Sequence, residues 1–181
     1  MADWKTLSTR VAYENPYAYI EESDVINPGG HQTVYGVLKS KADGVYIVPV
    51  DEHGNTYLVQ QFRYTLKENS WEVPAGRIDG KDFLASAKRE LHEETGLDAE
   101  RFTELATINP VNGMAAIFQK IYLAEGLTAT DDALDAVDGI LACKKLPIDD
   151  VVSMIMNGEI HCPQTITAIF MAKEHLRRRT A

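Results

Sequence analysis

The chain has 181 residues, which fits one domain because domains typically run to about 100–200 residues. Its hydrophobic fraction of 45% excludes a disordered chain, and it contains no apolar run near the ~20 residues that cross a bilayer. An excess of Asp and Glu gives a formal charge of −9, which opposes binding to a phosphate backbone. We therefore expect neither a nucleic-acid partner nor a membrane partner.

The N-terminus lacks the basic stretch and apolar core of a secretory signal. The two cysteines, Cys143 and Cys162, form no Cys-x-x-Cys motif. These features predict a reducing, cytoplasmic setting.

The first half of the chain is predicted to form strands. Residues 33–38 follow the turn 27–30 and have the composition of a strand. Residues 45–50 and 56–62 are strand candidates that flank the turn residues 51–55. This pattern predicts a hairpin.

A central helix is predicted over residues 83–95. Its apolar residues Leu84, Ala87 and Leu91 recur at helical spacing and predict one buried stripe. Asp82 is suited to cap the first turn, and Gly96 to end the helix.

The second half is predicted to contain two strands, an acidic loop and two terminal helices. We expect these elements at 103–109, 116–123, 130–138, 148–157 and 164–178. Gly158 closes the first of the terminal helices and Pro163 opens the second. Strands on either side of a central helix, followed by terminal helices, predict an α/β fold with a mixed sheet between helices.

The central helix carries a dense group of carboxylates. Glu90, Glu93 and Glu94 stand at i, i+3 and i+4, so they are expected on one side of the helix. Carboxylates this close repel one another unless a cation neutralises them, and hard oxygen ligands suit Mg²⁺ or Mn²⁺. Arg89 can pair with Glu93 one turn later. The alternative is a solvated helix face with no metal.

The segment Arg89-Glu90-Leu91-His92-Glu93-Glu94-Thr95-Gly96-Leu97 resembles the second half of the Nudix box at every specified position. The first half departs from the pattern, since Ala75 and Lys81 stand where the box has Gly and Glu. Either the loop before the helix is one residue shorter than usual, or Asp82 replaces the Glu. The resemblance implies a Nudix α/β/α sandwich made by a single domain over residues 1–181.

Further segments resemble the ADP-ribose pyrophosphatase branch of this family. They are Gln61-Phe62-Arg63 and Trp71-Glu72-Val73-Pro74-Ala75-Gly76. The resemblance implies that Glu90, Glu93, Glu94 and the Ala75 carbonyl bind Mg²⁺, with Mn²⁺ as an alternative. It also places Arg63 on the diphosphate, with Trp71, Glu72 and Tyr35 as further substrate-binding residues. For Arg63 the alternative is an exposed strand-end charge, and for Trp71 it is core packing.

The group that activates water is less well defined by the resemblance. The family usually has a Glu in the loop after the strands, but residues 130–140 of this chain contain only Asp. Asp138 and Asp135 are therefore candidates beside Glu93.

The resemblance implies an enzyme that splits the diphosphate of a small nucleoside diphosphate derivative. ADP-ribose is the expected substrate, giving AMP and ribose 5-phosphate. A different nucleoside diphosphate sugar is the first alternative, and a non-catalytic nucleotide sensor is the second. Relatives of this branch are commonly homodimers to which N-terminal strands contribute, so residues 1–40 are expected to take part in a dimer.

Overall fold

The computed structural model describes residues 3–78, 80–130 and 139–179. Contacts between Cα atoms divide the chain into two compact units. One comprises residues 1–43 and 109–118, and the other 44–108 and 119–181. No helix in the described ranges is long and apolar enough to span a membrane. The expectation of one domain over 1–181 stays a prediction.

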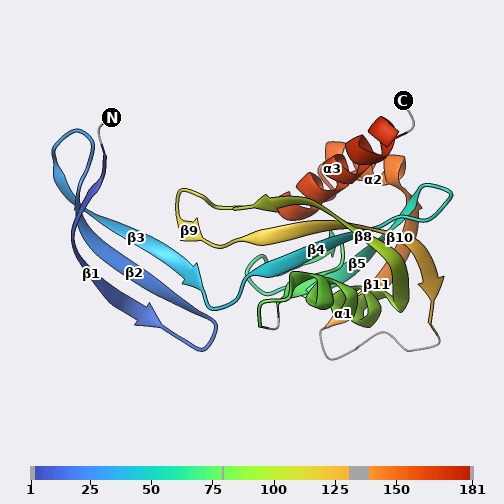
Figure 1. Cartoon of the computed structure of the whole chain (residues 1–181), viewed down its shortest axis with the longest axis horizontal. Helices are drawn as coiled ribbons and strands as arrows, with labels where there is room; N and C mark the ends of the chain where they lie inside the picture. Colours follow the sequence, from blue (N-terminus) through green and yellow to red (C-terminus); the bar gives the residue numbers. More distant parts are fainter. Residues whose placement is uncertain (1–2, 79, 131–138, 180–181) are drawn as a thin grey trace. The chain divides into compact units, whose positions relative to one another are not determined.

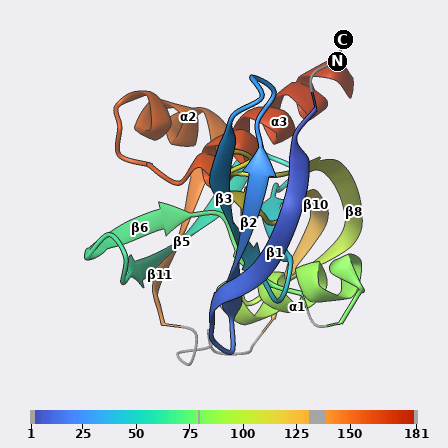
Figure 2. The same cartoon turned by 90° about the vertical axis from the view of Figure 1, so that its left-hand side faces the viewer.

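The smaller unit is a four-stranded sheet in the order β1-β2-β3-β9. Its strands are β1 (Lys5–Glu14), β2 (Ala18–Ile26), β3 (Gln32–Ser40) and β9 (Ala115–Ala116). The first three are antiparallel neighbours, and β9 pairs with β3 in parallel. Figure 2 shows β1, β2 and β3 side by side. Every residue of β1 is exposed, so this sheet contributes few residues to the core.

The larger unit contains two sheets and three helices. The first sheet has the order β7-β4-β10-β8, and the second has the order β11-β5-β6. The strands are β4 (Gly44–Pro49), β5 (Asn55–Arg63), β6 (Glu68–Glu72), β7 (Ala75–Arg77), β8 (Leu97–Ile108), β10 (Gln119–Ala129) and β11 (Ile140–Pro147). The helices are α1 (Phe83–Thr95), α2 (Ile148–Met156) and α3 (Pro163–Arg179).

Strand β4 is the centre of this unit, because all six of its residues are buried. Val45 and Ile47 pack with Ala87 and Leu91 of α1. The alternate residues of β4 belong to a second cluster, which contains residues of α2 and α3. Successive side chains of a strand point to opposite faces, so a continuous apolar strand requires cover on both sides.

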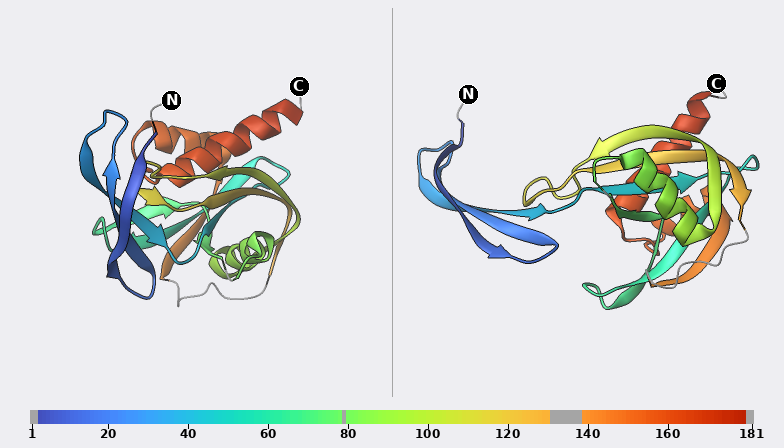
Figure 3. Two further views of the ribbon diagram at one scale, coloured as in Figure 1. Left: turned by 60° about the vertical axis from the view of Figure 1, so that its left-hand side comes forward. Right: turned by 60° about the horizontal axis from the view of Figure 1, so that its bottom comes forward.

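Helix α1 lies on one side of the sheets, with α2 and α3 on the other (Figure 1 and Figure 3). Strands β4 and β10 run parallel, whereas the other pairs in their sheet are antiparallel. The predicted α/β fold with a mixed sheet between helices is therefore confirmed.

The predicted hairpin of residues 45–50 and 56–62 is wrong. Only Val50 and Thr56 form a bridge, and the strands then separate into different sheets. β4 takes β10 and β7 as neighbours, whereas β5 takes β11 and β6. A strand buried on both faces belongs inside a sheet covered by helices. The residues of the turn at 51–55 do not indicate which strands will lie beside it.

Three further expectations need correction. β8 begins at Leu97, directly after the helix, and β10 extends to Ala129, so both strands are longer than predicted. In the added part of these strands, Arg101 of β8 and Glu125 of β10 form a cross-strand ion pair. Leu84 is 40% exposed, so only Ala87 and Leu91 of the predicted stripe are buried.

Candidate active site

Helix α1 begins and ends where the sequence predicts. The Asp82 carboxylate accepts a hydrogen bond from the Ala85 backbone N–H at 3.0 Å, which satisfies one donor of the first turn. Gly96 has φ 66°, and its N–H donates to the His92 carbonyl. This left-handed conformation favours glycine. Asp82 therefore acts as the helix cap in the structure.

The three carboxylates of the helix do not share one environment. Glu90 and Glu94 are 5% and 4% exposed, whereas the Glu93 side chain is 30% exposed. With 3.6 residues per turn, positions i and i+4 are separated by about 40° around the helix, but i+3 and i+4 by about 100°. Glu90 and Glu94 therefore face the fold together, and Glu93 diverges from them.

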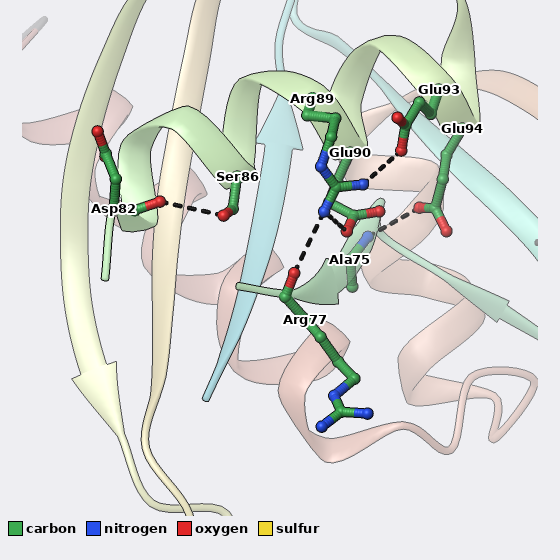
Figure 4. Close-up of polar contacts among 8 residues, drawn as sticks. All are labelled: Ala75, Arg77, Asp82, Ser86, Arg89, Glu90, Glu93 and Glu94. Carbon is green, nitrogen blue, oxygen red and sulfur yellow. Dashed lines mark hydrogen bonds and ion pairs between the residues drawn. The ribbon is translucent and has the colours of Figure 1, made fainter. Parts of the chain in front are cut away.

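Arg89 and the backbone of β7 hold these carboxylates (Figure 4). Arg89 donates to Glu93 at 2.5 Å and to Glu90 at 2.6 Å. Burial disfavours the charged guanidinium, but Glu90 and Glu93 raise the pKa of Arg89 above its ordinary value. Glu94 accepts a hydrogen bond from the Ala75 N–H at 2.8 Å. The expected Arg89–Glu93 pair is thus confirmed.

Gly76 leaves room for the Glu90 carboxylate because it has no side chain. A Cβ at this position would lie 1.9–2.4 Å from three carboxylate atoms of Glu90. No real Cβ tolerates such distances, so the Glu90 carboxylate occupies the space that any other side chain would need. Sequence reasoning missed this role, although the Ala75-Gly76 pair before the helix marks the position.

The two buried carboxylates line a cavity of about 330 Å³ in volume. Its lining residues are Gln61, Ala75, Gly76, Arg77, Arg89, Glu90 and Glu94. Within the described residues, the buried Gln61 Nε2 has no hydrogen-bond partner. An unsatisfied buried donor costs about 1–3 kcal/mol, so this amide is suited to donate to an oxygen of a ligand in the cavity.

The chemistry of this donor set fits a hard divalent cation. Carboxylate and carbonyl oxygens are the ligands that such ions prefer. Glu90 and Glu93 already bind one positive group, the Arg89 guanidinium. In the described part of the chain, no three His, Cys, Asp or Glu side chains are gathered tightly enough to hold a metal. Glu90, Glu94 and Ala75 share the cavity, whereas Glu93 is not among its lining residues.

Arg63 and Glu72 form a partly buried ion pair at a second cavity. Arg63 Nε and Nη2 donate to the two carboxylate oxygens at 2.7 and 2.6 Å. Burial alone would raise the pKa of Glu72, but its bonds with Arg63 lower it below the ordinary value. Both residues line a cavity of about 500 Å³. Arg63 is therefore more than an exposed strand-end charge.

The remaining predicted site residues lie elsewhere. Trp71 is partly buried and packs against the core. Tyr35, in the smaller unit, donates to the Gly113 carbonyl at 2.8 Å and packs edge-on against Trp4. Asp135 and Asp138 lie outside the described residues.

Comparisons with known proteins agree on the family. A model of the NUDIX domain matches residues 40–159, more than half of the chain. An ADP-ribose pyrophosphatase of Mycobacterium tuberculosis is 32% identical over 87% of this chain and 77% of its own length. An ADP-ribose pyrophosphatase of Bacillus subtilis is 25% identical over 91% of this chain and 90% of its own length.

A solved structure confirms the fold. The crystal structure of an ADP compounds hydrolase superposes with a TM-score of 0.85 at 18% identity, covering 97% of this chain and 95% of that one. The mixed sheet between helices and the carboxylate-bearing helix thus define an enzyme of the hydrolase class. The chain belongs to the Nudix family.

Proposed function

We propose that the protein is a Mg²⁺-dependent hydrolase of small nucleoside diphosphate derivatives, with ADP-ribose as its preferred substrate. AMP and ribose 5-phosphate would be the products. The main support for this proposal is the cavity that buried Glu90 and Glu94 line together with Ala75 and Gln61. The names of the two pyrophosphatase relatives support the choice of substrate.

The Glu90 and Glu94 carboxylates and the Ala75 carbonyl would hold Mg²⁺ or Mn²⁺, with Glu93 completing the set on leaving Arg89. A bound divalent ion neutralises charge that develops at phosphorus and lowers the pKa of water. Gln61 Nε2 would donate to a diphosphate oxygen. Arg63 would orient the diphosphate through Nη1, because Glu72 engages its Nε and Nη2.

We also propose that the protein is a homodimer formed through the smaller unit. Several apolar side chains of this sheet are more than a third exposed, namely Leu7, Val11, Tyr13, Ile20, Val34, Tyr35 and Leu38. Sheets with apolar side chains require cover from a second layer. Sedimentation at twice the chain mass of 20.1 kDa is expected, and sedimentation as one chain would contradict the proposal.

Turnover is expected to require a divalent cation. With Mg²⁺ the protein should release AMP from ADP-ribose. Excess EDTA should reduce the rate to background, because it removes the ion that neutralises charge at phosphorus and activates water. Phosphate release after phosphatase treatment measures the rate. Full activity in EDTA would exclude the metal mechanism. If the protein cleaved only another nucleoside diphosphate sugar, that sugar would replace ADP-ribose as the proposed substrate. If it cleaved no diphosphate, a nucleotide sensor would be favoured.

Replacing Arg63 with alanine should affect both kinetics and stability. Loss of a charge-assisted hydrogen bond, about 1.5–3 kcal/mol, predicts a 10- to 100-fold lower kcat/KM. Glu72, which is 3% exposed, would lose its guanidinium partner, so we expect about 1–3 kcal/mol lower free energy of unfolding. Steady-state kinetics and urea denaturation measure the two effects.

Arg10→Ala is the matched control, because Arg10 pairs with Glu22 on the surface with its side chain 76% exposed. An exposed pair contributes little to stability. If both variants behaved alike, the assignment of Arg63 to the substrate would be wrong.

We propose that an acidic residue activates the attacking water, with Asp138 as the first candidate. Asp138→Asn should then lower kcat by about 10²-fold with little change in KM. If Glu93 is the base, Glu93→Gln should show that pattern instead, although the structure holds Glu93 on Arg89. Asp135→Asn tests the neighbouring position of the loop. Near-normal kcat in all three variants would show that none of these residues acts as a general base.

A further inference from the structure

Two residues, Val73 and Pro74, join β6 to β7. Ala75, the next residue, begins β7 and donates to Glu94 at 2.8 Å (Figure 4). We propose that Thr165 of α3 is a positioning residue for catalysis, whose hydroxyl holds Val73 and thereby fixes Ala75 at the metal site. The inference deepens the proposed function and rests on it, because that function gives the Ala75 carbonyl to the metal.

The hydroxyl of Thr165 accepts a hydrogen bond from a buried backbone donor. The Val73 N–H donates to Thr165 Oγ1 at 3.2 Å, and both residues are 0% exposed. A buried N–H without a partner destabilises the fold, so this bond holds the segment in place. Hydroxyl groups in a helix commonly bond to a carbonyl one turn earlier, as Thr167 does with the Pro163 carbonyl at 2.7 Å. Thr165 accepts instead from the β6–β7 segment, 92 residues earlier in the sequence.

Pro74 makes the segment stiff, so a shift at Val73 reaches Ala75. The proline ring fixes its own φ and restricts the preceding residue to extended conformations. The Pro74 carbonyl accepts from the Ile47 N–H of β4 at 2.8 Å. Three successive residues are thus bound by three elements, with α3 at Val73, β4 at Pro74 and α1 at Ala75. The bond to α3 can be removed by mutation without changing a residue that lines the carboxylate cavity.

Thr165 acts on the site only through the segment that it holds. It is not among the described residues that line the carboxylate cavity or the cavity of Arg63 and Glu72. A displacement of about 1 Å from a change far from the chemistry can cost on the order of 10²-fold in rate. Groups that orient metal ligands typically contribute about 10- to 100-fold to metal affinity or activity. Loss of the hydroxyl should therefore weaken metal binding and turnover together.

Four variants of the full chain isolate the hydroxyl. Thr165→Val keeps the shape of the side chain but removes its oxygen. Thr165→Ala and Thr165→Ser both lack the methyl group, and only the serine keeps the oxygen. Thr167→Val is the matched control, because the hydroxyl that it removes bonds within α3. Urea denaturation shows whether each variant is folded under the assay conditions.

Two measurements on the folded variants test the positioning role. The kcat for ADP-ribose at saturating Mg²⁺ should fall about 10- to 100-fold in Thr165→Val and Thr165→Ala, with little change in KM. The Kd for Mn²⁺ alone, measured without substrate by electron paramagnetic resonance, should rise about 10-fold or more in the same two variants. Thr165→Ser and Thr167→Val should stay within about 3-fold of the parent chain in both measurements.

Several outcomes would overturn the role of Thr165. They are normal kcat and Mn²⁺ binding in the variants without the hydroxyl, equal losses in Thr165→Ser or Thr167→Val, and a rise in KM alone. If Thr165→Val did not fold, Thr165→Ala and Thr165→Ser would give the same test, because they differ by one oxygen. If neither variant without the hydroxyl folded, the hydroxyl would serve folding and not positioning. If Mn²⁺ binding weakened as expected but the parent chain cleaved no diphosphate, the proposed function would fail while the role of Thr165 at the metal site would hold.

Discussion

The Glu94→Gln variant is expected to lose about 10²–10³-fold in kcat, the usual consequence of removing one group that stabilises charge in the transition state. Glu94 is 4% exposed and accepts from the Ala75 N–H at 2.8 Å. Glutamine has the same length and keeps an acceptor for that N–H, so the fold should be retained. The lost negative charge should weaken metal binding, which titration with Mg²⁺ during turnover would measure.

His92→Gln is the matched control on the same helix. The His92 side chain is 35% exposed and contacts Asp98 at 3.1 Å, and it does not line the carboxylate cavity. Its replacement should change kcat less than about 3-fold, within the scatter of surface substitutions. If the two variants lost activity equally, the assignment of Glu94 to the cavity side of α1 would be wrong.

The Gly76→Ala variant should also be nearly inactive, although it removes no functional group. The new methyl carbon would lie 1.9 Å from Glu90 Oε1, so the carboxylate or β7 must move. A displacement of about 1 Å at a reacting group can cost on the order of 10²-fold in rate. Overpacking also costs about 1–3 kcal/mol of stability. Kinetics at saturating Mg²⁺ and urea denaturation together separate the two effects.

Gly36→Ala is the control for this substitution. Gly36 lies in β3, has no positive φ, and a Cβ there meets no heavy atom within 4 Å. This variant should keep normal kcat. Normal kcat for Gly76→Ala as well would show that the close approach to Glu90 has no part in catalysis.

Local sequence patterns determined the elements that depend on local interactions. Asp82 and Gly96 bound the central helix as predicted, because capping and left-handed turns involve only neighbouring residues. The terminal helices were also predicted to within one residue at each end. The box on α1 and the two segments before it predicted the family, which the comparisons show.

The tertiary structure decided how these elements pair and which polar groups meet. Strand β4 leaves β5 for β10, more than 70 residues later in sequence, because a strand with two apolar faces is stabilised only between two layers of helices. The packing of α1 against the sheets decides that Glu90 and Glu94 are buried while the Glu93 side chain stays 30% exposed.

Two contacts of the site join residues that are distant in sequence. Gly76 meets the Glu90 carboxylate, and Ala75 donates to Glu94 19 residues later. The Gln61 Nε2, which has no hydrogen-bond partner among the described residues, comes from a third element, β5. Helical spacing could place carboxylates on α1, but only the packing of β5 and β7 against that helix determines which of them are buried and what faces them.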